Sequence, residues 1–310
     1  MKRALLCGVM LLGTAAFTAS AQEMEKPRYH HTRINAVDPA ASIQWYKTMF
    51  SAVPVKYRGV SDAVLVDRSF ILFNKVDEPA PWKLVSGIYH IGWGGIDGPS
   101  EFEWRNKKGV EWETPLSTLG NNYFMYAYGP DKEVVEVWTG CEHERFGHVH
   151  LFSDDVGAAT EWYVKNLNLT GPARMAPKPP AAPKDFKANP DNPMEIFRYL
   201  WSSQVTTEND VTINLFATPS ADTVNWWSYD PIDELVASDG RSINHLAFSY
   251  RDIEPVCERM KANGVEIVKP IEESKEFGFK SCFVRGPDEV LSEIVEGKPS
   301  GEGVWWSLLE

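Results

Sequence analysis

Two short segments of the chain share a Gly-Pro-Asp turn followed by a strand-like run that carries one acid. The first segment, GPDKEVVEVW, contains Glu136, and the second, GPDEVLSEIV, contains Glu293. Four of the seven histidines open a second shared pattern, in which an apolar stretch begins with His and reaches Asp seven residues later: His31, His90, His148 and His245. Imidazole and carboxylate groups are the usual protein ligands of zinc, iron and similar divalent metals. The residue types therefore point first to metal chemistry carried on strands.

The elements that would position these residues form a repeat. After each Asp comes a segment that fits an amphipathic helix, with Asp as its N-cap, because the carboxylate can accept hydrogen bonds from the first free amides. We expect helices over residues 39–50, 99–109, 157–167 and 253–264. Strand-like stretches follow each helix, so each unit is expected to contain a strand, a helix and then roughly three strands.

The four units alternate in kind. Units one and three share Trp-Tyr in the helix, at Trp45 and Trp162, whereas units two and four share Gly-Val-Glu after the helix and the Gly-Pro-Asp hairpin. This alternation indicates a duplicated two-unit domain. We expect the halves to be residues 29–140 and 145–297, with a boundary near Gly140.

The two ends of the chain fall outside the repeat. Residues 1–21 combine two basic residues with an apolar run and a stretch of small residues, which is typical of a secretory signal peptide. The apolar run is shorter than the roughly 20 residues that span a bilayer. We therefore expect cleavage, no membrane anchor afterwards, and a periplasmic or secreted protein that ends in a tail over residues 298–310.

Two internal segments also interrupt the repeat. Residues 171–194 are rich in Pro, Ala and Lys, and residues 218–240 contain the pair Trp226-Trp227. Both are expected to be long loops, which in compact domains are often lids or binding loops. Packing arms are the alternative for both segments.

Composition limits the partners. A net charge of −12 makes the chain a poor partner for nucleic acid or an anionic membrane surface. Cys141, Cys257 and Cys282 follow the expected signal segment, and they allow one disulfide that the sequence alone does not pair.

The full pattern of His, Asp, helix, three strands and a closing Pro-Asp turn before Glu resembles the vicinal oxygen chelate superfamily. That superfamily includes glyoxalase I, extradiol ring-cleaving dioxygenases and bleomycin-binding proteins. The resemblance covers nearly all of residues 29–140 and 145–297. It implies an α+β fold in which four βαβββ units pair into two glyoxalase-like open-barrel domains, each shaped as a cup. It also implies a divalent metal that chelates a small-molecule substrate, and units that pair between subunits in a homodimer.

The resemblance implies a ligand set made of one His from the first strand of each unit and one Glu from the last strand of the second unit. Carried over, the amino-terminal half offers His31, His90 and Glu136, and the carboxy-terminal half offers His148, His245 and Glu293. Two neutral imidazoles and one carboxylate leave open positions on Fe2+, Mn2+, Zn2+ or Ni2+. We favour the carboxy-terminal set, because both long loops belong to that half. Strand alternation predicts that His30 points away from His31 and lies at the surface.

A fourth ligand, which glyoxalase I takes from the end of its first unit, has no acidic counterpart. The comparable strands carry Leu72 and Asn214 near that position. His150 shares the strand face of His148 and is a candidate for an alternative ligand or a base, with Tyr126 as a second candidate base. No catalytic residue is assigned beyond these.

Ring-cleaving dioxygenases place a His and a Tyr ahead of their final Glu. Unit four has Phe283 where that Tyr is expected and Gly286 in place of an acid, and it lacks the His. This departure favours lyase or isomerase chemistry, so we expect an exported metal-dependent enzyme that acts on a small oxygenated substrate. Two alternatives remain, namely an extradiol-type dioxygenase with an altered proton relay and a non-catalytic small-molecule binding protein.

Overall fold

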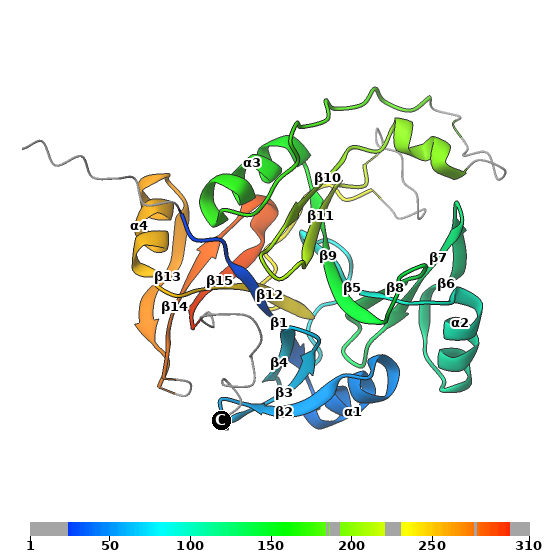
Figure 1. Ribbon diagram of the computed structural model, residues 1–310, viewed down its shortest axis with the longest axis horizontal. Helices are drawn as coiled ribbons and strands as arrows, with labels where there is room; N and C mark the ends of the chain where they lie inside the picture. The colour runs from blue at the N-terminus through cyan, green and yellow to red at the C-terminus, as the bar shows by residue number, and fades with distance from the viewer. Residues whose placement is uncertain (1–23, 184–185, 187–192, 221–230, 276–277, 298–310) are drawn as a thin grey trace, which may run out of the picture.

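The computed structural model describes residues 24–183, 186, 193–220, 231–275 and 278–297 (Figure 1). The expected signal segment, the pair Trp226-Trp227 and the expected tail lie outside the described residues. Among the helices of the described part, none has the length and apolar character needed to cross a membrane.

The described elements follow the predicted repeat, except that in the described part of unit three two strands, not three, follow the helix. Unit one contains β1 (Arg28–Ala36), α1 (Pro39–Phe50), β2 (Val53–Tyr57), β3 (Ser61–Val66) and β4 (Ser69–Lys75). Unit two contains β5 (Ile88–Gly94), α2 (Gly98–Lys107), β6 (Trp112–Leu119), β7 (Asn122–Tyr128) and β8 (Val134–Trp138). Unit three contains β9 (Arg145–Ser153), α3 (Val156–Leu167), the 3-10 helix η1 (Pro193–Arg198), β10 (Ser202–Thr206) and β11 (Thr212–Ala217). Unit four contains β12 (Ile243–Tyr250), α4 (Glu254–Ala262), β13 (Glu266–Glu273), β14 (Lys280–Arg285), the 3-10 turn η2 (Pro287–Glu289) and β15 (Leu291–Glu296).

The helices begin where the repeated Asp predicts. The carboxylate of Asp38 accepts from the first amides of α1, and those of Asp97 and Asp155 do the same for α2 and α3. In unit four the N-cap position shifts to Ile253. The Asp252 carboxylate there accepts a hydrogen bond from the backbone amide of Glu254, at 3.1 Å. The Asp side chains thus fix where each chain segment turns from strand into helix.

The strands form two sheets, and each sheet takes one unit from each half of the chain. The order of the eight-stranded sheet is β13-β14-β15-β12-β1-β4-β3-β2, and the order of the seven-stranded sheet is β10-β11-β9-β5-β8-β7-β6. We call the first sheet cup 1–4 and the second cup 2–3, after the units that form them. In Figure 1 the two cups lie side by side, with β1 and β12 in one and β5 and β9 in the other. The expected pairing of units one and two, and of three and four, is therefore wrong. All four units open with the same strand pattern, so this pattern does not choose between the possible pairings.

The Gly-Pro-Asp hairpins supply the contacts within each half. The Asp131 carboxylate accepts from the backbone amide of Val37 and from the hydroxyl of Ser42, both at 2.9 Å, and so ties unit two to unit one. In the second half, the Asp288 carboxylate accepts from the backbone amide of Asp154 at 3.0 Å and ties unit four to unit three. Sheets join units across the halves and hairpins join them within the halves, so the four units close into a ring of contacts.

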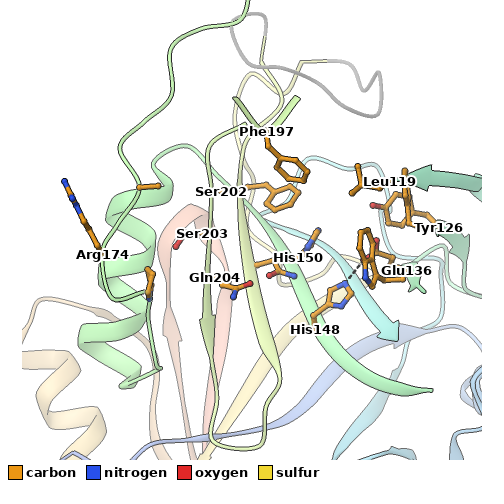
Figure 2. Close-up of a pocket in the computed structure, with 16 residues that line it drawn as sticks. Leu119, Tyr126, Glu136, His148, His150, Arg174, Phe197, Ser202, Ser203 and Gln204 are labelled. Carbon is orange, nitrogen blue, oxygen red and sulfur yellow. Dashed lines mark hydrogen bonds and ion pairs between the residues drawn. The ribbon is translucent and has the colours of Figure 1, made fainter. Parts of the chain in front are cut away.

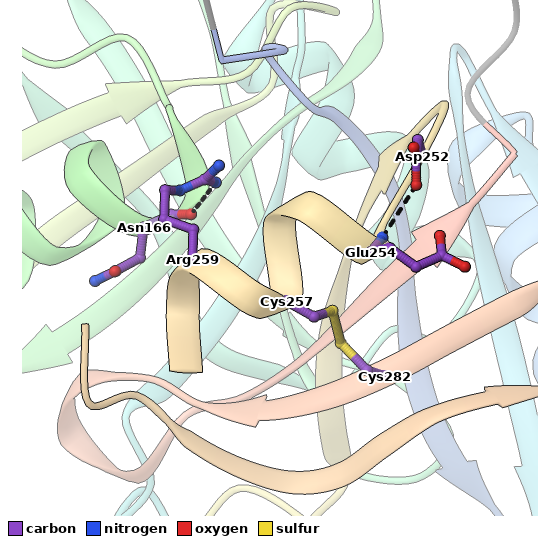
Figure 3. Close-up of a disulfide and its surroundings, with 6 residues drawn as sticks. All are labelled: Asn166, Asp252, Glu254, Cys257, Arg259 and Cys282. Atoms are coloured by element: carbon purple, nitrogen blue, oxygen red, sulfur yellow. Dashed lines mark hydrogen bonds between the residues drawn. A yellow bond between two sulfur atoms is a disulfide. The ribbon is translucent and has the colours of Figure 1, made fainter. Parts of the chain in front are cut away.

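A disulfide fastens the helix of unit four to its sheet. Cys257 of α4 is bonded to Cys282 of β14 (Figure 3). Cys141 is a free thiol. Beside the bridge, the Arg259 side chain donates to the backbone carbonyl of Asn166, at 2.9 Å. This contact holds α4 against the end of α3.

A buried acid lies next to the first hairpin. The hydroxyl of Tyr46 donates to Glu133 Oε1 at 2.8 Å, and the backbone amide of Asp131 donates to Glu133 Oε2 at 3.0 Å. Burial raises the pKa of the Glu133 carboxyl from 4.5 to about 7, and the hydrogen bond from Tyr46 offsets only part of this rise. Glu133 therefore holds a proton in the folded protein under conditions in which it is ionised in the unfolded chain.

We expect Glu133 to make the protein less stable as the pH rises. Between pH 4.5 and about 7 the unfolded chain releases this proton while the folded chain keeps it, so the free energy of unfolding falls, by up to about 3 kcal/mol. Glu133→Gln removes this dependence, and its amide can still bond to the Tyr46 hydroxyl, which accepts as well as donates. Urea denaturation at pH 5 and at pH 8 should show the variant gaining stability relative to the wild type at the higher pH. The same difference in stability at both pH values would contradict the assignment.

Candidate metal sites in the two cups

The first His-Glu cluster lies inside cup 1–4. Its members are His31 on β1, His245 on β12 and Glu293 on β15. The Nε2 atoms of His31 and His245 both lie 3.3 Å from the same atom, Glu293 Oε2. The three residues are 1%, 4% and 6% exposed, so the cluster is shielded from solvent.

Second contacts orient both imidazoles of this cluster. His31 Nδ1 lies 2.7 Å from His30 Nδ1, and His30 Nε2 lies 3.0 Å from the hydroxyl of Tyr57. His245 Nδ1 lies 2.7 Å from Asn244 Oδ1. The prediction that His30 is a surface residue is wrong, because a register shift in the pairing of β1 with β12 falls at His30, between Tyr29 and His31. This bulge breaks the alternation and leaves His30 buried, at 1% exposure.

The second cluster lies inside cup 2–3 and has four members. His90 on β5 places Nε2 3.1 Å from Glu136 Oε2 on β8, and His148 on β9 places Nε2 2.5 Å from the same oxygen. His150 follows on β9, and one potential ligand atom from each of the four residues lies within 4.8 Å of the others. His150 therefore takes the position of a fourth donor in this cup.

The structure brings the six predicted residues together in a grouping different from the expected one. His148 lies with His90 and Glu136, whereas His245 and Glu293 lie with His31. The grouping by halves is wrong for the same reason as the pairing of units, since each cup combines a unit from each half. That these residues bind a metal stays a prediction.

The acids of both clusters favour their ionised form. Burial by itself would raise the pKa of the Glu136 carboxyl, but the nearby imidazoles of His148 and His90 outweigh it and hold that pKa well below its ordinary range. Glu293 behaves in the same way beside His245 and His31. Burial lowers the pKa of four imidazoles despite the neighbouring carboxylates, so all four are neutral at pH 7: His31, His90, His150 and His245. Neutral imidazoles and ionised carboxylates are the forms that ligate metals.

The donor set fits a divalent cation. Each cup points two imidazole nitrogens at one carboxylate oxygen, which is the arrangement of a 2-His-1-carboxylate site. Within the described residues, His31 Nε2 is buried without a hydrogen-bond partner, as are His90 Nδ1 and His150 Nδ1. A buried polar atom without a partner is unfavourable, and a bound cation would satisfy His31 Nε2 directly.

Cup 2–3 opens into a cavity of about 520 Å³ (Figure 2). Glu136, His148 and His150 lie at its wall. Five aromatic side chains also line it: Phe124, Tyr126, Trp138, Phe197 and Phe216. Figure 2 shows the Gln204 side chain on the same side of this space as His148, while Arg174 lies well to the side and points away from the cluster.

The expected loop over residues 171–194 borders this cavity in its described part. Pro172, Arg174 and Ala176 have no regular secondary structure and line the opening together with Phe197 of η1. This agrees with a binding loop over the open side of cup 2–3.

Cup 1–4 differs in the side chains that surround its cluster. Tyr57, Leu65, Phe70 and Leu72 form a buried apolar cluster on the unit-one side. Leu72 and Asn214 are the two positions at which an acidic fourth ligand is absent. Leu72 pairs with Arg33 in cup 1–4, and Asn214 pairs with His150 in cup 2–3. The two cups therefore share a ligand arrangement, and the cavity of about 520 Å³ belongs to cup 2–3.

Gly92 is a site residue that the sequence analysis missed. A Cβ built on Gly92 would lie 2.1 Å from both Cε1 and Nε2 of the His148 ring. The ring therefore occupies the space that any other residue at position 92 would fill. The signal was present in the sequence, because HIGWGG has Gly two residues after His90 where HLAFSY has Ala247 after His245.

The comparisons with known proteins agree with this fold. Residues 145–294 match the family model described as the Glyoxalase/Bleomycin resistance protein/Dioxygenase superfamily. A lactoylglutathione lyase from Pseudomonas aeruginosa is 37% identical over 65 residues, which make up 21% of this chain and 35% of that protein. The chain thus matches about a third of the length of this relative.

Solved structures resemble the whole arrangement of units. Glyoxalase I from Zea mays has a TM-score of 0.64 at 15% identity, over 87% of this chain and 92% of that one. A putative dioxygenase from Bacillus subtilis has a TM-score of 0.57 at 12% identity, over 89% of this chain and 87% of that one. At these identities the likeness concerns the fold alone. The match to the glyoxalase/bleomycin resistance protein/dioxygenase superfamily, also known as the vicinal oxygen chelate superfamily, therefore concerns residues 145–294, and the rest of the described chain shares the fold.

Proposed function

We propose that this protein is a metal-dependent enzyme whose active site is cup 2–3. The observation that carries the proposal is a cavity of about 520 Å³ whose wall includes Glu136, His148 and His150. A ligand cluster alone could be structural, and a cavity alone could bind a molecule without changing it. Their coincidence gives a substrate direct access to a metal site that keeps open positions.

The cavity lining indicates a substrate with a flat apolar body. Five aromatic rings line part of its wall, and the amide side chains of Gln204 and Asn214 come from paired positions on β10 and β11. Amides offer both donors and acceptors without charge. We therefore propose a small molecule that presents two neighbouring oxygens toward the His-Glu cluster and a ring or other apolar group toward the aromatic wall.

We favour lyase or isomerase chemistry on this substrate. A divalent cation bound by His90, Glu136 and His148 would act as a Lewis acid and lower the pKa of a hydroxyl that it holds. The chain itself contributes the aromatic side chains of the cavity wall. It also contributes His150, which lies two residues after His148 on the same face of β9 and lines the same cavity. The name of the Pseudomonas aeruginosa relative, lactoylglutathione lyase, agrees with this reaction class.

A second candidate function, ring cleavage with dioxygen, is favoured by Tyr126. The position at which unit four lacks the expected Tyr belongs to cup 1–4, where Phe283 pairs with Glu293. In cup 2–3 the residue paired with Glu136 is Tyr126, and its ring centre lies 5.0 Å from that of His90. A phenol and His150 beside the ligands could handle the protons of such a reaction.

We also propose an exported location. The signal-like amino terminus supports it, and so does the bond between Cys257 and Cys282, because disulfides persist mainly outside the reducing cytosol.

Metal content and chelator binding test the proposed function together. The protein, purified without chelating agents and reconstituted separately with Fe2+, Mn2+, Zn2+ or Ni2+, should hold metal. By calorimetry it should also bind kojic acid, an uncharged ring with two neighbouring oxygens. Metal-free protein should bind kojic acid far more weakly. Absence of metal after every reconstitution would refute the enzyme proposal and leave a binding protein. Oxygen uptake by the Fe2+ form with catechols would select the dioxygenase.

A further inference from the structure

We propose that the carboxy-terminal residues 304–309 dock onto an apolar face inside cup 1–4 of the same chain, and thereby control access to the cluster of His31, His245 and Glu293. This inference does not depend on the activity of cup 2–3 or on any bound metal. Residues 298–310 lie outside the described part of the chain, whereas the receiving face lies within it. We call this face the inner face of unit one.

Strand alternation builds the inner face of unit one. Five side chains that are at most 6% exposed form it: Tyr57 of β2, Ala63 and Leu65 of β3, and Phe70 and Leu72 of β4. Val64 and Ile71, which alternate with them, belong instead to the core that includes side chains of α1. Val55 and Phe279 pack against the five and are only partly buried. Apolar surface therefore continues past the buried members of the face, where a further segment can cover it.

Comparison with cup 2–3 shows which kind of occupant this face suits. Leu72 and Asn214 hold equivalent positions, because each pairs with the residue two positions after the repeated His of the neighbouring strand. Ala63 pairs with Leu72 as Gln204 pairs with Asn214. In cup 2–3 the two amide side chains line the cavity of about 520 Å³. The inner face of unit one has apolar side chains at both positions, so it suits an apolar segment better than a polar small molecule.

The carboxy-terminal residues have the composition of such an occupant. The run Val304-Trp305-Trp306-Ser307-Leu308-Leu309 is apolar except for one Ser, and it follows the segment KPSGEG. Segments rich in Gly, Ser and Pro are typical linkers. A Trp side chain can bury roughly 150–250 Å², so two adjacent Trp residues favour a site that removes them from water.

Charge and aromatic contacts at the border of the face also match this segment. Arg33 lies at the cup 1–4 position that His150 holds in cup 2–3, beside Leu72. The guanidinium carbon of Arg58 lies 5.7 Å from the ring centre of Phe279. The apolar run is flanked by two acids, Glu302 and Glu310. Basic groups at the border of an apolar face favour a segment with acids at its ends.

The end of the described chain lies within reach of the face. The backbone amide of Gly297 donates to the carbonyl of Tyr250 at 3.0 Å, so the chain passes the end of β12 there. Because β12 is antiparallel to β1 and β1 is parallel to β4, this is the end of the sheet at which β4 begins, next to Phe70. Only β12 and β1 separate β15 from β4, a distance of roughly 14 Å at ~4.8 Å per strand. Residues 298–304 can span up to roughly 23 Å.

Amide hydrogen exchange followed by mass spectrometry tests the docking in the full chain. In the double variant Trp305→Ser, Trp306→Ser, residues 61–75 of β3 and β4 should exchange at least about tenfold faster than in the wild type, because their cover is lost. Residues 202–217 of β10 and β11, the equivalent strands of cup 2–3, are the internal control and should be unchanged. A synthetic peptide of residues 298–310 should bind the double variant and restore slow exchange. It should bind the wild type far more weakly, because the chain's own segment has the higher effective concentration.

A substitution in the receiving face gives a second readout. Leu72→Asn places there the residue that cup 2–3 has at the equivalent position, and it should speed the exchange of residues 304–309 without changing residues 202–217. Equal exchange of residues 61–75 in the wild type and the double variant would overturn the proposal. So would an equal rise in residues 61–75 and 202–217, since the segment would then stabilise the whole fold. A wild-type dimer that the double variant converts into monomers would instead place the segment in a second copy.

Discussion

Glu136→Gln should abolish metal-dependent ligand binding and turnover in cup 2–3. Glu136 Oε2 is the oxygen on which both His90 and His148 converge, at 3.1 Å and 2.5 Å. A neutral amide does not supply the negative charge that balances the cation. Its oxygen is also a weaker metal ligand than a carboxylate oxygen. Removing a residue that only hydrogen-bonds to a metal ligand already lowers metal affinity roughly 10–100-fold. We therefore expect a loss of more than about 100-fold from replacing the ligand itself, measured by competition with a metallochromic dye.

Glu293→Gln is the matched control for this experiment. It makes the same chemical change at the equivalent position of cup 1–4, away from the cavity that Glu136 lines. Binding of kojic acid should therefore be unaffected by Glu293→Gln at a temperature where both variants are folded. The reverse result, with kojic acid lost only in Glu293→Gln, would move the active site to cup 1–4.

Gly92→Ala should have nearly as large an effect, without touching any ligand. The added methyl group would overlap the His148 ring, whose Cε1 and Nε2 atoms lie 2.1 Å from the position of the new Cβ. The imidazole must rotate away, and its Nε2 then leaves Glu136 Oε2. We expect metal affinity at cup 2–3 to fall roughly 10–100-fold, as for a ligand that is present but wrongly oriented.

Gly147→Ala gives the control for an added methyl group on the neighbouring strand. The nearest atom to a Cβ at Gly147 is the carbonyl oxygen of Arg145, at 4.0 Å, which is ordinary contact. This variant should bind Co2+ at cup 2–3 as tightly as the wild type. If both Gly92→Ala and Gly147→Ala kept the wild-type Co2+ spectrum, His148 would not be a ligand.

Local structure was predictable because each unit carries its own signals. Helix α1 occupies residues 39–50 as predicted, since Asp38 caps it and Pro39 suits its first turn. The residue types of both clusters were also visible, because His opens the first strand and Glu lies in the last strand of the relevant units. These features depend only on short stretches of chain.

The grouping of the ligands was not predictable in the same way. Strand pairing is made by backbone hydrogen bonds, and β1, β5, β9 and β12 all open with the same pattern. The environment of His30 depended on a bulge opposite β12, which a single strand does not reveal. The choice of the carboxy-terminal set failed because it combined His148 of one cup with His245 of the other.

The cross-half pairing of units has a consequence for any shorter form of this protein. A fragment that ended near Gly140 would contain β1 without β12 and β5 without β9, so two sheets would be left with unpaired edges. Such a fragment could satisfy both edges only by exchanging units with a second copy, giving two cups at a two-fold axis. The present chain is thus equivalent to a dimer of half-length chains joined end to end. Covalent joining frees the two cups to diverge, as they do where Tyr126 pairs with Glu136 and Phe283 pairs with Glu293, which identical subunits cannot do.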